Sequence, residues 1–87
     1  MSPASARTDE LLAKSKLTVG EITEIVAERV AKLPSVRTVS VEDVGEISVD
    51  LVGGKRIEVQ TLPVAHAFNE SMATRRVALD QLLERCA

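Results

Sequence analysis

Few residues of this chain have side chains that commonly do chemistry. His66 is the only histidine and Cys86 the only cysteine among 87 residues. A general base needs a nucleophile or an orienting carboxylate near it in space, and the sequence neighbours of His66 are both alanines. No group of Cys, His and acidic residues has the spacing of metal ligands. We therefore predict a protein that is not an enzyme, with no catalytic residue, no metal site and no cofactor.

Gly53 and Gly54 are followed by Lys55 and Arg56, a combination that can hold an anion because bare backbone amides lie beside cations. A phosphate-binding loop, however, carries more glycines and leads from a strand into a helix. Here a second run of alternating apolar residues follows the pair. We interpret the glycines as a turn and the two cations as solvated side chains.

The segment from Ile47 to Thr61 predicts a β-hairpin, because two runs of alternating apolar residues meet at the glycine pair. A two-residue loop would place the two apolar rows on opposite faces of the sheet. A three-residue loop of residues 52–54 instead sets Val49 against Ile57. Gly54 is then free to take the left-handed conformation that closes such loops.

A second hairpin is predicted upstream, where Asp43, Val44 and Gly45 form another three-residue loop. Val41 then faces Ile47, and all three strands share one apolar face. That face consists of Val39, Val41, Ile47, Val49, Leu51, Ile57 and Val59. The opposite face is polar, so helices must cover the apolar one.

Helices are predicted before and after the three strands in the sequence. Thr18 with Glu21 is a capping-box signature, and apolar residues follow at helical spacing until Pro34. Residues 63–87 hold one long helix or two shorter ones, and we favour two. Asn69 and Ser71 are the predicted interruption points, and Thr74 is a predicted cap for a separate final helix. The predicted fold class is α+β: a small two-layer domain with a helix, a three-stranded antiparallel meander, then one long or two short C-terminal helices.

Residues 1–16 are predicted to be a flexible N-terminal tail, and residues 17–87 a single α+β domain. The small residues near the start have little apolar surface to bury. Leu11 and Leu12 are the exception. They indicate either a frayed extension of the first helix, which we favour, or a helical turn that docks on a partner or on the core.

Net charge, apolar runs and cysteine content together limit the partners and the cellular location that we predict. Eleven Lys and Arg against 13 Asp and Glu give a net charge of -2, which supplies no electrostatic reason to expect nucleic acid or an anionic membrane. No apolar run is long enough for a signal peptide or a membrane span. A single cysteine suits a reducing compartment. We predict a cytoplasmic protein.

A seam in the C-terminal segment is the candidate partner-binding surface. Seven residues recur there at alternating spacings of three and four, typical of a heptad pattern. Such a seam packs either on the domain's own sheet or on another helix. A short chain with one aromatic residue has little core, which favours dimerisation. The predicted partner-binding residues are Phe68, Met72, Arg75, Leu79 and Leu82.

The predicted function is a small non-enzymatic protein-interaction or assembly module. It would bind another protein or self-associate as a homodimer, through the C-terminal helix or through a sheet edge at residues 36–41 or 56–61. The order of a helix, three strands and a helix is similar to that of small dimeric nucleoid-associated proteins of the YbaB type. This likeness of order alone implies the alternative, a nucleic-acid-binding dimer, although a basic patch and stacking aromatics are absent.

Overall fold

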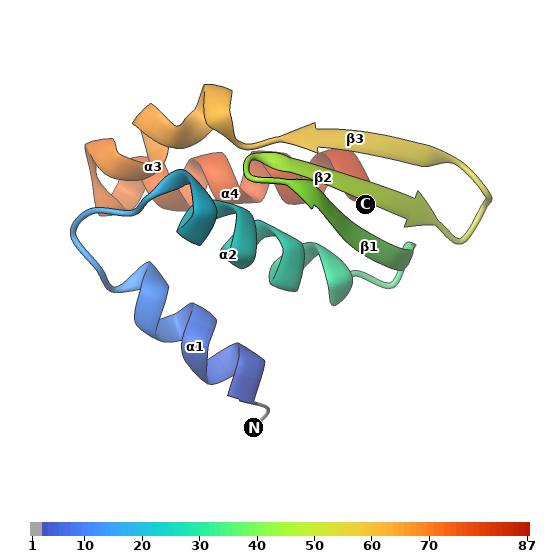
Figure 1. Ribbon diagram of the computed structural model, residues 1–87, viewed down its shortest axis with the longest axis horizontal. Coiled ribbons are helices and arrows are strands. Elements are labelled where there is room, and N and C mark those ends of the chain that lie inside the picture. Colours follow the sequence, from blue (N-terminus) through green and yellow to red (C-terminus); the bar gives the residue numbers. More distant parts are fainter. Residues whose placement is uncertain (1–2) are drawn as a thin grey trace.

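The computed structural model describes residues 3–87, which fold into helices and one three-stranded antiparallel sheet of order β1-β2-β3 (Figure 1). The predicted α+β fold class is confirmed. The elements are α1 (Pro3–Leu12), α2 (Val19–Ala31), β1 (Val36–Asp43), β2 (Glu46–Leu51), β3 (Arg56–Gln60), the 3-10 turn η1 (Leu62–Val64), α3 (Ala65–Glu70) and α4 (Met72–Cys86).

The β2–β3 turn has the predicted three-residue loop. Val49 pairs with Ile57, as the parity of the two apolar rows requires. The Leu51 amide donates to the Lys55 carbonyl at 2.8 Å, and the Gly54 amide donates to the Leu51 carbonyl at 2.9 Å. Gly54 has a φ of 90°, so it occupies the left-handed region for which glycine is suited.

The β1–β2 turn keeps the predicted register but is tighter than expected. Val41 pairs with Ile47, and Gly45 has a φ of 87°. A register shift after Val41 then allows Asp43 to pair with Glu46, which leaves two residues between the paired positions instead of three. The extra residue is absorbed in the strand as an irregularity of the kind that β-bulges produce.

The apolar face of the sheet and the apolar stripe of α2 form most of the core. The Thr18 side chain accepts a hydrogen bond from the Glu21 amide at 3.1 Å, and the Glu21 carboxylate accepts one from the Thr18 amide at 2.9 Å, so the predicted capping box is present. The fully buried apolar residues of these elements are Ile22, Ile25, Val26, Val30, Ile47, Val49 and Val59. Both helix and sheet therefore bury one face against the other.

The C-terminal segment contains two α-helices, as favoured from the sequence. Ser71 separates them with an extended backbone at φ -160° and ψ 165°. Its hydroxyl accepts a hydrogen bond from the Thr74 amide at 3.0 Å and so caps α4. Ser71 was one of two predicted interruption points, whereas Thr74, which we considered as a cap, is the capped residue.

The N-terminal segment differs from the predicted tail of residues 1–16. Residues 1–2 lie outside the described part of the chain, but the following residues form α1. Leu11 is 4% exposed and belongs to the core, because α1 packs along α2. Arg7 and Glu24 also form an ion pair at 2.7 Å between these helices. Docking of a helical turn on the core, the less favoured alternative, is therefore the arrangement observed.

Gly54→Ala should lower the free energy of unfolding by about 1 kcal/mol, because a side chain at a φ of 90° is strained. The neighbouring Gly53→Ala is a matched control. Neither position has an atom within 4 Å of an added Cβ, but Gly53 has no positive φ. Urea unfolding of the two variants measures the difference, and equal losses would contradict the left-handed assignment.

Candidate functional site

The predicted partner-binding seam faces the interior of the chain over most of its length. Phe68, Leu79 and Leu82 are at most 8% exposed and belong to the core, and Arg75 is 3% exposed. Met72 alone among the five predicted residues lies at the surface, with 54% exposure. The seam therefore packs within the chain, where α4 lies against α2 and α3.

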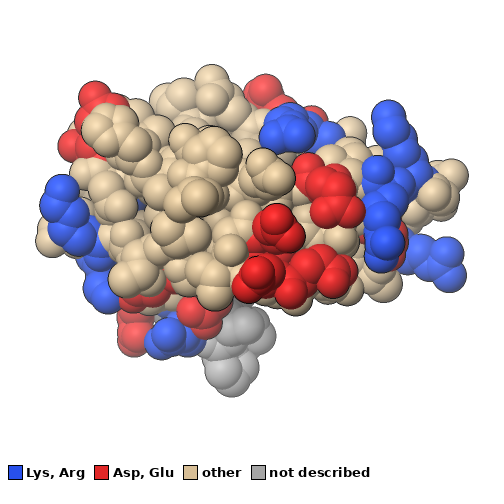
Figure 2. Space-filling view, turned by 45° about the horizontal axis from the view of Figure 1, so that its top comes forward, with Lys and Arg blue, Asp and Glu red and all other residues tan. Residues whose placement is uncertain are grey.

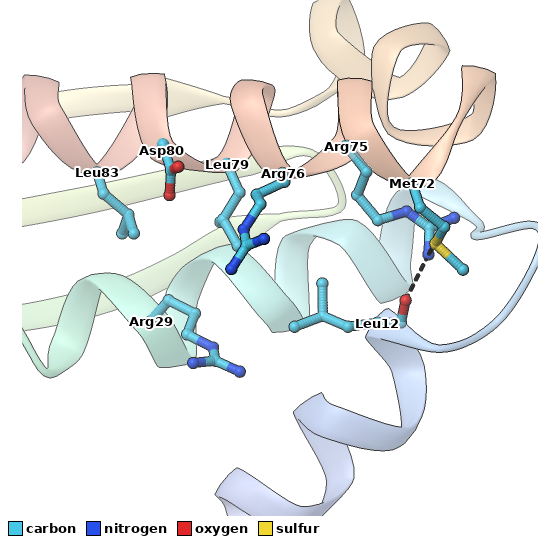
Figure 3. Close-up of a pocket in the computed structure, with 8 residues that line it drawn as sticks. All are labelled: Leu12, Arg29, Met72, Arg75, Arg76, Leu79, Asp80 and Leu83. Atoms are coloured by element: carbon cyan, nitrogen blue, oxygen red, sulfur yellow. Dashed lines mark hydrogen bonds between the residues drawn. The ribbon is translucent and has the colours of Figure 1, made fainter.

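Arg75 binds backbone carbonyls instead of a partner or a carboxylate. Its Nε donates to the Phe68 carbonyl at 2.7 Å, and Nη1 donates to those of Leu12 and Lys14, both at 2.7 Å. Nη2 reaches the Ser15 carbonyl at 3.4 Å. Figure 3 shows the guanidinium pointing from α4 to the end of α1. Arg75 thus fastens the connection between α1 and α2 to α4.

Asn69 reinforces the same connection from α3. Its Oδ1 accepts a hydrogen bond from the Leu17 amide at 2.7 Å, and its Nδ2 donates to the Leu17 carbonyl at 2.9 Å. Both backbone groups of Leu17 are therefore satisfied just before α2 begins. The partners are 52 residues apart in the sequence, so no local pattern reveals the contact.

An apolar groove lies beside the outer edge of β1. It has a volume of about 270 Å³ and is lined by Gly20, Thr23, Glu24, Ala27, Val41 and Val44. Val41 was predicted to belong to the covered face, yet it is 55% exposed, and Val44 in the turn is 69% exposed. The small side chains of Gly20 and Ala27 leave Val41 uncovered. In the sequence, only Val44, an apolar residue in a predicted turn, indicates this surface.

A buried hydroxyl network holds the end of this groove. The hydroxyl groups of Thr23 and Thr61 lie 2.9 Å apart, and the Gly45 amide donates to the Thr23 hydroxyl at 3.1 Å. The Thr61 amide in turn donates to the Gly45 carbonyl at 2.9 Å. These bonds join α2, the β1–β2 turn and the end of β3, and therefore give the exposed turn a fixed position.

Charges are separated along the sheet. Four exposed acidic residues belong to the β1–β2 turn and the strand positions near it: Glu42, Asp43, Glu46 and Glu58. The opposite end carries the exposed cations Arg37, Lys55 and Arg56. Figure 2 shows Lys and Arg side chains at the end that holds the β2–β3 turn in Figure 1, and acidic side chains nearer the middle.

The residues with potential for chemistry are dispersed. His66 is exposed on α3, whereas Cys86 is fully buried. Burial raises the pKa of the Cys86 thiol, and the nearby Arg85 charge opposes this shift only in part. In the described residues no group of three or more His, Cys, Asp or Glu is arranged to hold a metal ion.

Comparison with protein-family models, curated proteins and solved structures finds no match to this chain. No helix within residues 3–87 is long and apolar enough to cross a membrane. The fold and its surfaces are therefore the basis for a functional assignment. Those surfaces belong to a small α+β domain with an open antiparallel sheet.

Arg75→Met should lower the free energy of unfolding by about 2–4 kcal/mol, because carbonyls of the α1–α2 connection and of α3 lose their donors. Arg76→Met is the matched control on the same helix. Arg76 is exposed, so its replacement should change stability by less than about 0.5 kcal/mol. Urea unfolding gives the free energy of unfolding of both variants. Faster amide exchange of Leu17 in Arg75→Met would show that the loss of stability lies in the α1–α2 connection. Similar stabilities would contradict the role of Arg75.

Proposed function

We propose that this protein is a non-enzymatic self-association module in which the β1 edge of one copy pairs with the β1 edge of a second. Within residues 3–87, the open sheet of order β1-β2-β3 has no strand beside the outer edges of β1 and β3. Unpaired edge amides and carbonyls are templates for an added strand. The C-terminal seam is a weaker candidate because most of it is buried within the chain.

The exposed side chain of Val41 is the observation that carries the proposal. It points to the helix-covered face of the sheet, as its pairing partner Ile47 does, but Ile47 is 0% exposed and Val41 is 55% exposed. The groove between Val41 and α2 has an almost entirely apolar lining. An added strand would cover this apolar surface and would also supply hydrogen-bond partners to the unpaired amides and carbonyls of β1.

The residues of β1 are complementary to a second copy in the antiparallel direction. A two-fold axis perpendicular to the sheet, midway between the Ser40 residues of the two copies, sets Val39 of one copy opposite Val41 of the other. It also brings Arg37 at the start of one strand near Asp43 at the end of the other. The charge separation along the sheet favours the same direction, since basic and acidic ends then meet.

The β3 edge is less suited to this role. Arg56, Glu58 and Gln60 are exposed along it, whereas its apolar residues Ile57 and Val59 are partly or fully buried. Both edge strands carry exposed charges, but only β1 also has an exposed large apolar side chain, Val41. Sheet-edge association is therefore assigned to β1.

The geometry of β1 also limits the strength of the contact. Register shifts lie between Val36 and Thr38 and between Val41 and Asp43, which leaves a regular stretch of residues 38–41. Irregularities of this kind restrict edge pairing. We therefore expect a dimer that dissociates on dilution.

Val41→Lys should abolish the dimer, because a desolvated ammonium group would lie at the centre of the contact. Val77→Lys is the matched control: Val77 is 54% exposed on α4, and Val41 is 55% exposed. Sedimentation equilibrium over a hundredfold range of protein concentration measures the mass of each variant. Wild type and Val77→Lys should approach the dimer mass, and Val41→Lys should remain a monomer.

Two outcomes count against this proposal. A wild-type protein that stays monomeric at the highest concentration would remove self-association altogether. Dissociation by Val77→Lys with no effect of Val41→Lys would move the contact to α4. Circular dichroism should show that both variants remain folded, as expected for substitutions at exposed positions, so that the measured masses report association alone.

A further inference from the structure

A second cavity lies between α1, α2 and α4, away from the β1 groove. It is an open cleft of about 370 Å³ lined by Leu12, Arg29, Met72, Arg75, Arg76, Leu79, Asp80 and Leu83 (Figure 3). None of these residues lines the β1 groove. The cleft is therefore a surface that the proposed dimer leaves free.

The floor of the cleft is aliphatic. Leu79 belongs to the core, and Leu12 and Leu83 are partly buried and packed against it. Met72 at one end is exposed and flexible enough to adapt to different shapes. An extended hydrocarbon chain would bury apolar surface along this floor. The volume of the cleft falls within the range of small-molecule sites.

Two guanidinium groups border the floor. Arg76 extends from α4 toward α2, where the side chain of Arg29 lies (Figure 3). No ion pair involves Arg76 in the part of the chain that the structure describes. Arg29 donates to Asp9 through Nη2 at 2.9 Å, but its buried Nε has no hydrogen-bond partner. A Glu28 carboxylate oxygen lies 3.6 Å from this Nε, which is an ion-pair distance but too long for a hydrogen bond, so Asp9 and Glu28 both offset the charge of Arg29.

Two further charges determine how much negative charge the cleft accepts. Arg75 contributes a buried cation whose three nitrogens each donate to a backbone carbonyl, and Nη1 also donates to Met72. Asp80 lines the same cleft and would repel a dianion. One negative charge is therefore favoured and two are not.

We propose that this cleft binds a monoanionic amphipathic ligand, a free aliphatic carboxylate of the fatty-acid class. The carboxylate accepts hydrogen bonds from the exposed Arg76 guanidinium, which forms no ion pair within residues 3–87, and the hydrocarbon chain lies along Leu12, Leu79 and Leu83. Guanidinium groups suit this head group because their planar donors match the two carboxylate oxygens.

Isothermal titration calorimetry with decanoate, below the concentration at which it forms micelles, tests the proposal. Decanoate should bind one site per chain, and octanoate should bind at least about tenfold more weakly, since each buried methylene changes affinity by about fourfold. Decan-1-ol and decyltrimethylammonium, which lack the negative charge, should each bind at least tenfold more weakly than decanoate. Inorganic phosphate should not bind.

Arg76→Gln should weaken decanoate binding about tenfold, whereas Arg85→Gln should leave it unchanged. Both arginines are exposed on α4, but Arg85 does not line the cleft, so this pair separates a local contact from a general effect of charge. Chemical-shift changes at the Leu79 and Leu83 methyl groups should accompany binding. Equal binding of decyltrimethylammonium, preferential binding of phosphate, or equal losses in the two variants would each overturn the proposal. So would binding of an acidic helical peptide in the absence of decanoate binding.

Discussion

The fold depends on one constraint: a sheet of three strands that can bury only one of its faces. Side chains alternate along a strand, so a slip of one residue at either turn would move Ile47 or Val49 from full burial into water. Gly45 and Gly54, in the left-handed conformation, oppose such a slip because they fix where each turn closes and therefore which residues pair. Every helix of the core must then lie on the same side of the sheet.

The single apolar face also explains which surfaces remain open. The stripe of α2 packs on the sheet, and Phe68, the only aromatic residue, is fully buried in the same core. Coverage ends where α2 presents small side chains to β1. Val41 is therefore exposed although its register is that of a core residue. An apolar side chain left uncovered next to an unpaired strand edge is a feature that association with a second chain would complete.

Much of this architecture could be predicted because its determinants are local. The parity of the strands, the capping box at Thr18 and Glu21, and the interruption at Ser71 each depend on residues within a few positions of one another. In these cases short-range stereochemistry and tertiary packing favour the same structure.

The candidate sites could not be predicted in the same way. The carbonyls that Arg75 binds in the α1–α2 connection lie about 60 residues earlier in the chain, and they belong to the backbone, which leaves no mark on residue type. A regular heptad spacing likewise indicates that a helix packs against another surface, but it does not identify that surface. Leu11 was recognised as unusual in a polar segment, yet a single leucine pair does not distinguish docking from fraying.

The helix α2 connects the two proposed surfaces and also separates them. At about 100° per residue, Ala27 beside β1 and Arg29 beside the cleft project about 160° apart around the helix axis. Their neighbours Ile25, Val26 and Val30 are fully buried, so the core lies between the two faces. A ligand on one face therefore has no direct contact with a partner on the other. The close-packed, fully buried residues between α2 and the sheet resist small displacements, which opposes coupling of the two faces through the core.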